Sequence, residues 1–164
     1  MLAMSFVRFL MLLALVVWVG GIVFFAFVVA PNLFIMLPTR QLAGQVVSRA
    51  LGELHWMGIA AGLIFLLCSL VERARATGSL RAVSPRNLLM VGMLALTLTS
   101  QFAVGRKMLA LRAEMGVIDN VAQNDPRRVE FNQLHQWSTR LEGGTLLLGL
   151  LTLWVLSRQW SSPR

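Results

Sequence analysis

Charge is the property that this sequence lacks over most of its length. Four stretches contain no Asp, Glu, Lys or Arg: residues 9–39, 54–71, 87–105 and 143–157. Only 13% of all residues are charged, whereas a soluble domain has about 25%. This shortage excludes an ordinary soluble domain and predicts a membrane protein that crosses the bilayer several times.

Cysteine is also scarce, and the common enzyme motifs are missing. Cys68 is the only cysteine, which excludes an intrachain disulfide and a cysteine metal cluster. The sequence contains no P-loop, nucleophile elbow, HExxH or CxxCH motif, so the usual signatures of nucleotide, ester, peptide and haem chemistry are absent. These absences favour a protein that is not an enzyme and leave the question open.

Three of the four uncharged runs come close to or exceed the length of a membrane-spanning helix, and the fourth is shorter. A helix rises about 1.5 Å per residue and needs roughly 20 apolar residues to cross about 30 Å of hydrocarbon. The fold class predicted is an all-α integral membrane four-helix bundle, formed by a single domain over residues 1–164. The expected spans cover about residues 9–30, 54–71, 87–105 and 141–157.

Local signals add detail to this bundle. Between Arg40 and Leu54, apolar residues recur at helical spacing, which predicts an interfacial amphipathic helix after the first span. Ser84 and Asp125 each precede a proline, and this pattern predicts a helix start at both positions. Gly58 and Gly62 have GxxxG spacing, which favours close helix packing in lipid.

The charges that do occur are mostly positive. The net charge is +8, and anionic lipid headgroups are the expected partner. No basic helix or stacking-aromatic module accompanies the charge, so we do not expect nucleic acid binding. A second copy of the chain and another membrane protein both remain open as partners.

Arginines between the runs predict the orientation. Four of them crowd the connection between the second and third runs: Arg73, Arg75, Arg81 and Arg86. Because arginine-rich connections stay in the cytoplasm, this pattern favours a bacterial inner (plasma) membrane location with both termini cytoplasmic.

His55 and His135 are the only histidines. With four spans, both fall at the same end of the bundle, so they could meet. Paired histidines can ligate copper, zinc or a b-type haem, which makes them candidate metal ligands. The alternative is a structural role in hydrogen bonding.

A second candidate site is a polar stripe on the last predicted helix. Its members share one helical face: Asn132, His135, Ser138, Thr139 and Glu142. The last uncharged run is short, so Glu142 is placed near or below the membrane surface, where an ionisable group usually faces a bundle interior or water.

Several segments also resemble a known family. Residues 18–21 (WVGG), 24–27 (FFAF), 30–34 (APNLF) and 131–138 (FNQLHQWS) are similar to the small membrane family of unknown function that includes transmembrane protein 205. This resemblance spans nearly the whole chain and implies a four-helix integral membrane protein. A looser similarity to copper-resistance D-type membrane proteins implies a metal role.

Three functional hypotheses follow, and a membrane enzyme is the least favoured of them. The first is a non-enzymatic scaffold or transport-associated component that uses the polar stripe. The alternative is a copper or haem binding membrane protein that uses His55 and His135.

Overall fold

The fold is a bundle of four long helical rods, seen in a computed structural model that describes residues 2–77 and 84–161. The first rod consists of α1 (Leu2–Phe24), the π-helical turn η1 (Phe25–Val29) and α2 (Ala30–Met36), and the second is α3 (Arg40–Thr77). The third rod consists of α4 (Pro85–Leu98), the π-helical turn η2 (Thr99–Gly105) and α5 (Arg106–Met115). A short 3₁₀ turn, η3 (Ile118–Asn120), precedes α6 (Pro126–Ser161).

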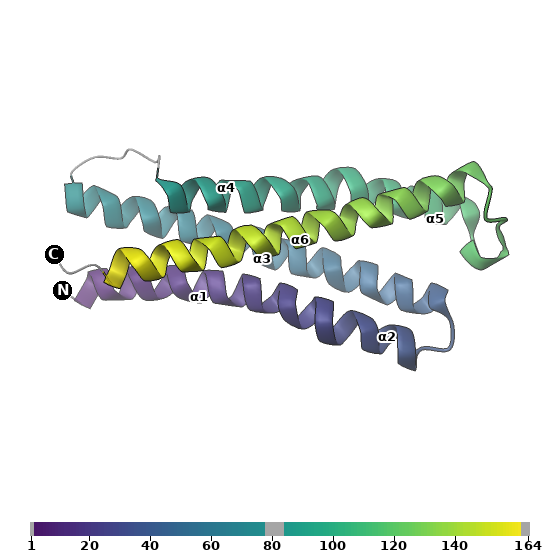
Figure 1. Cartoon of the computed structure of the whole chain (residues 1–164), viewed down its shortest axis with the longest axis horizontal. Helices are drawn as coiled ribbons and strands as arrows, with labels where there is room; N and C mark the ends of the chain where they lie inside the picture. The colour runs from purple at the N-terminus through teal and green to yellow at the C-terminus, as the bar shows by residue number, and fades with distance from the viewer. Residues whose placement is uncertain (1, 78–83, 162–164) are drawn as a thin grey trace.

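The rods run up and down, so that the start of α1 and the end of α6 lie at the same end of the bundle (Figure 1). In the described part of the chain, four helices are long and apolar enough to cross a membrane. The predicted all-α membrane bundle of four helices is therefore confirmed.

The segment after the first rod differs from the prediction. It is not a separate interfacial helix, because α3 runs without a break from Arg40 to Thr77. No proline interrupts this stretch, so the backbone hydrogen bonds can continue from the polar part into the apolar part. As a result, the second rod extends well beyond its uncharged run.

Both predicted helix starts are confirmed. The Ser84 hydroxyl accepts a hydrogen bond from the Asn87 backbone N–H at 3.4 Å, and Pro85 is the first residue of α4. Asp125 accepts from the Arg127 N–H at 2.9 Å just before α6. Hydrogen bonds from the Arg127 side chain also lower the pKa of Asp125 to about 2.

The first rod continues past Pro31 to Met36, beyond the predicted end of the first span near residue 30. Proline has no N–H for the usual bond to the carbonyl four residues earlier. The π-helical turn η1 accommodates this, since the Ala30 N–H bonds to the Phe25 carbonyl. The Asn32 side chain donates to the Val28 carbonyl at 2.7 Å. These bonds let the rod continue to Met36.

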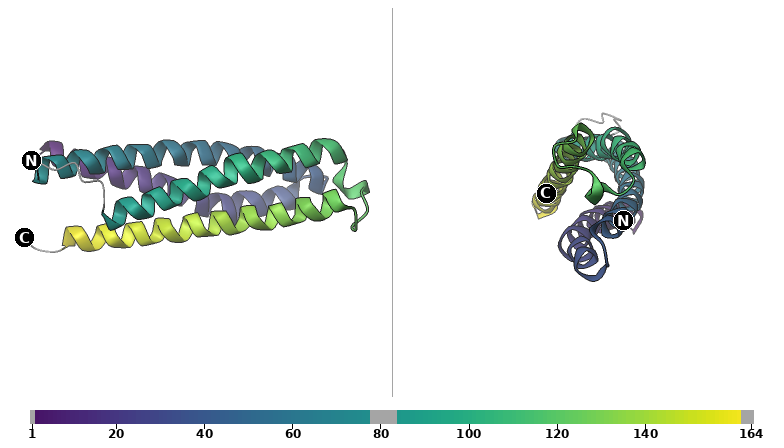
Figure 2. Two further views of the ribbon diagram at one scale, coloured as in Figure 1. Left: turned by 90° about the horizontal axis from the view of Figure 1, so that it is seen from above. Right: turned by 90° about the vertical axis from the view of Figure 1, so that its right-hand side faces the viewer.

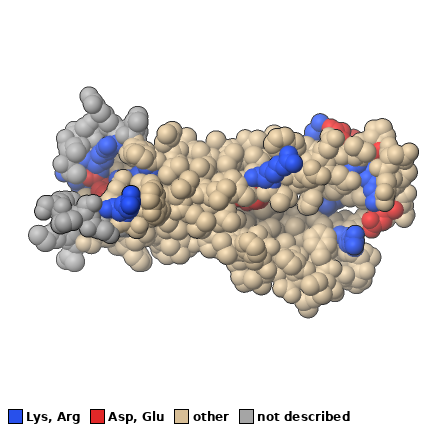
Figure 3. Space-filling view, in the orientation of Figure 1, with Lys and Arg blue, Asp and Glu red and all other residues tan. Residues whose placement is uncertain are grey.

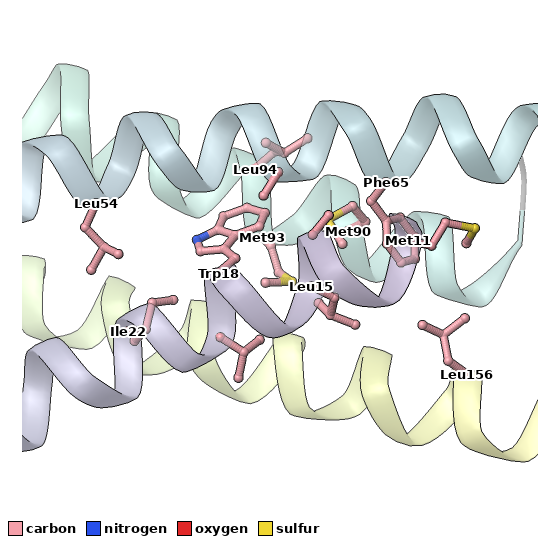
Figure 4. Packing of buried hydrophobic residues seen from close by; sticks show 13 residues of the cluster. Met11, Leu15, Trp18, Ile22, Leu54, Phe65, Met90, Met93, Leu94 and Leu156 are labelled. Atoms are coloured by element: carbon pink, nitrogen blue, oxygen red, sulfur yellow. The ribbon is translucent and has the colours of Figure 1, made fainter. Parts of the chain in front are cut away.

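Trp18 is the largest side chain of the apolar core and is 1% exposed. It points from α1 into the space between α3 and α4 (Figure 4). A Cβ at Gly58 would collide with the Trp18 indole, and a Cβ at Gly62 would lie 2.9 Å from Trp18 Cζ3 and 2.7 Å from Leu94 Cδ2. The two glycines therefore make room for the side chains of Trp18 and Leu94. The GxxxG spacing predicted close contact between helix backbones instead.

Charged side chains are concentrated toward the two ends of the bundle, and a basic patch also lies between them (Figure 3). At the end that holds the termini, Glu72 is 6% exposed and pairs with Arg8 at 2.6 Å and Arg86 at 2.7 Å. These contacts join α3 to α1 and α4. The sequence also places Arg73, Arg75 and Arg81 at this end. Arg81 lies outside the described residues.

Candidate functional site

A buried histidine joins three rods at about half the length of the bundle. His55 on α3 is 4% exposed. Its Nε2 lies 2.5 Å from Glu142 Oε1 on α6, and its Nδ1 lies 2.7 Å from Gln101 Oε1 on η2. We call these three residues the His55 cluster. It is a buried polar centre to which α3, η2 and α6 each contribute one side chain.

The π-helical turn η2 provides one of the three members. Gln101 and Ser100 both lie in this turn, and the Thr99 hydroxyl donates to the Ala95 carbonyl at 2.8 Å at its start. π-helical turns shift the faces of a helix and often occur at functional sites. Here the turn places an amide side chain beside the His55 ring.

The hydrogen bonds of the cluster can be satisfied in two protonation states. With the Gln101 oxygen toward the ring, His55 Nδ1 donates to it and Nε2–H donates to the Glu142 carboxylate, so the imidazole carries both protons. With the amide turned over, its NH₂ group donates to Nδ1 and the imidazole is neutral. A buried imidazole that keeps its partners in both states is suited to gain and lose a proton.

A cleft of about 1030 Å³, lined by both polar and apolar side chains, extends from the cluster toward the turn between α5 and α6. Its walls come from three parts of the chain. These are α3 between residues 41 and 56, the stretch from η2 through α5 between residues 100 and 117, and Ser138 of α6. His55, Ser100 and Gln101 all line it. Seen from the end of the bundle opposite the termini, the helices form an open arc (Figure 2).

The polar stripe divides into an inner and an outer part. Glu142 contacts His55, and Ser138, one turn earlier, lines the cleft. Asn132, His135 and Thr139 are exposed on α6, and the Thr139 hydroxyl donates to the His135 backbone carbonyl at 3.1 Å. Only the inner part belongs to the site that the structure forms.

The two histidines have different surroundings. Hydrogen bonds occupy both ring nitrogens of His55, while His135 is exposed. Within residues 2–77 and 84–161, no group of three or more His, Cys, Asp or Glu side chains is arranged to hold a metal ion. Binding of copper or haem by His55 and His135 stays a prediction.

Gln101 and Ser100 are site residues that the sequence analysis did not select. A signal was present, because Gln101 is one of few strongly polar side chains in the uncharged run 87–105. An amide at that depth needs a hydrogen-bond partner inside the bundle.

The match to a known family covers most of this site. The family model described as "Domain of unknown function (DUF4149)" matches residues 13–116. The chain belongs to the DUF4149 family. The match includes His55 and Gln101, while Glu142 lies beyond it. No curated protein and no solved structure matches the chain.

Proposed function

We propose that this DUF4149 member is a non-enzymatic, transport-associated membrane protein in which the His55 cluster carries a proton. One observation carries the proposal: His55 is buried inside a bundle of membrane-spanning helices and its two nitrogens are bonded to Gln101 and Glu142. Ionisable residues buried among membrane-spanning helices are costly, and they mark ion and proton pathways.

Buried polar side chains continue from the cluster toward the other end of the bundle. They are all at most 4% exposed: Ser100, Thr97, Thr145, Thr152, Ser69 and Asn87. Ser69 donates to Asn87 Oδ1 at 2.6 Å, and Asn87 follows Arg86, the partner of Glu72. Met90 and Met93 are fully buried within the same interval of α4. The buried polar groups therefore do not form a continuous row, because apolar side chains occur among them. A proton path along this row would require the two methionines to move.

The distance between the two buried charge clusters fits a bilayer. The rise along α3 from His55 to Glu72 is about 26 Å at about 1.5 Å per residue, close to the roughly 30 Å of hydrocarbon. In the proposed arrangement, the ion pairs of Glu72 lie at one membrane surface. The His55 cluster lies near the other, where water reaches it through the cleft.

The experiment measures proton flux in proteoliposomes that contain the purified full chain and a pH-sensitive dye. Potassium with valinomycin holds the membrane potential at zero while a pH gradient is imposed. We expect wild-type protein to dissipate the gradient faster than protein-free liposomes. Glu142→Gln should lower the protein-dependent rate at least about tenfold, because it removes a proton-exchanging group while keeping a polar side chain of the same size.

The matched control is Glu130→Gln, which makes the same chemical change on the same helix. Glu130 is 40% exposed and pairs with Lys107, away from the cleft. Its variant should conduct like the wild type. Wild-type flux no greater than that of empty liposomes would refute the proposed function.

We also infer that both termini face the cytoplasm of a bacterial inner membrane, as the arginines between the second and third spans favour. The resemblance to the transmembrane protein 205 family supports the same four-span topology. Reporter proteins fused after Gln123 and at the C-terminus should lie on opposite sides of the membrane. A periplasmic C-terminal reporter would contradict this orientation.

A further inference from the structure

The cleft above the His55 cluster is lined by an excess of positive charge. Arg49, Arg106 and Arg112 line it, and Glu53 is the only acidic residue among its lining residues. Three guanidinium groups against one carboxylate favour an anion. Because arginine presents several N–H donors in a planar fork, such a cluster suits an oxyanion.

The three arginines differ in how firmly they are held. Arg112 donates to the Gly44 carbonyl at 3.2 Å and to the Ser48 hydroxyl at 3.4 Å, and its guanidinium lies over the Phe131 ring. Arg106 lies over the Phe102 ring. Arg49 is exposed, and no side-chain hydrogen bond or ion pair joins it to another described residue. The Arg112 side chain is thus held in place at the wall of the cleft, while the Arg49 side chain can turn toward a ligand.

An independent observation points to a ligand deeper in the cleft. Ser100 lines the cleft and is 2% exposed. Within the described part of the chain, its hydroxyl has no hydrogen-bond partner. A buried hydroxyl without a partner destabilises the folded state unless a water or a ligand satisfies it. An oxyanion could accept that hydrogen bond.

One rim of the cleft is apolar. Trp56, Phe102 and Leu109 line it and are 53%, 36% and 60% exposed, and Trp56 packs edge-on against Phe102. Such a rim can cover the apolar part of a ligand whose charged group lies among the arginines.

We propose that the cleft binds a phosphate-type oxyanion, held by Arg49, Arg106 and Arg112, with Ser100 at its floor. This proposal rests on the proposed function, because it names the class of solute that binds in the cleft next to the proton-carrying His55 cluster. The same chemistry is present in a free phosphate ion and in the headgroup of an anionic lipid.

Binding is measured by isothermal titration calorimetry on the full chain in a neutral detergent. The probes are inorganic phosphate and dihexanoyl phosphatidic acid, a short lipid with a phosphate monoester headgroup. We expect saturable binding of at least one probe. The double variant Arg49→Gln and Arg106→Gln should weaken it by at least about tenfold, since charge-assisted hydrogen bonds are lost. Both side chains are exposed, so the fold should be retained.

The control double variant is Arg75→Gln and Arg158→Gln, which removes the same charge at the other end of the bundle. It should bind like the wild type. Ser100→Ala should weaken binding by up to about tenfold by removing one buried donor. Binding of phosphate itself identifies a free anion as the ligand, and binding of the lipid alone identifies a headgroup.

Two outcomes would overturn the oxyanion site: neither probe binds, or both double variants bind equally. Binding without proton flux would refute the transport proposal and leave this site in place. Proton flux without binding of either probe would refute the oxyanion site and leave the transport proposal in place.

Discussion

Gly58→Ala is expected to destabilise the bundle by about 1–3 kcal/mol, because it overpacks a core that is already full. The added methyl group would overlap the Trp18 indole, which is 1% exposed. Trp18 cannot withdraw easily, since Leu94 and Gly62 enclose the other edge of the same ring. Reversible unfolding by sodium dodecyl sulfate in mixed micelles measures the free energy of unfolding.

Gly20→Ala provides the matched control on α1. A Cβ at Gly20 would have no neighbouring atom within 4 Å, so the change should be neutral or stabilising by about 0.5–1 kcal/mol. Equal effects of the two variants would contradict the packing of Trp18 over Gly58.

Glu142→Ala is expected to cost about 1–3 kcal/mol of unfolding free energy, since it leaves His55 Nε2 buried without a partner. The His55 side chain is 5% exposed and that of Glu142 is 18% exposed. The same micelle unfolding assay measures this effect.

Glu130→Ala is the comparison on the same helix. Its ion pair with Lys107 joins side chains that are 40% and 56% exposed, and exposed pairs contribute only about 0–1 kcal/mol. A loss for Glu142→Ala no larger than that for Glu130→Ala would contradict a buried pair at His55.

The fold could be predicted from local rules because membrane spans are specified by uncharged length. Ser84 with Pro85 and Asp125 with Pro126 also fixed two helix starts, since capping depends on neighbouring residues alone. Local rules placed the end of the first span near residue 30, whereas the π-helical turn η1 lets the rod continue to Met36. Such turns depend on how neighbouring rods pack, and the chain has no simple pattern for them.

The candidate site was only partly predictable. Helical spacing placed Ser138 and Glu142 on one face, and depth in the membrane singled out Glu142. Spacing within one helix could not show which residue of another helix would meet it. The histidine selected with Glu142 was His135, on the same helix, whereas the structure brings His55 from α3. Gln101 depends on the π-helical turn η2 as well, so its place at the ring required the three-dimensional arrangement.

The measurement that tests the central claim most directly is a pair of double-mutant cycles on unfolding free energy. One cycle combines Glu142→Ala with His55→Ala, and the other combines Glu142→Ala with His135→Ala. A direct hydrogen bond at 2.5 Å predicts a coupling energy of about 1–2 kcal/mol between Glu142 and His55. The exposed His135 should show a coupling near zero. Coupling to His135, or none to His55, would contradict a proton-carrying cluster built on His55.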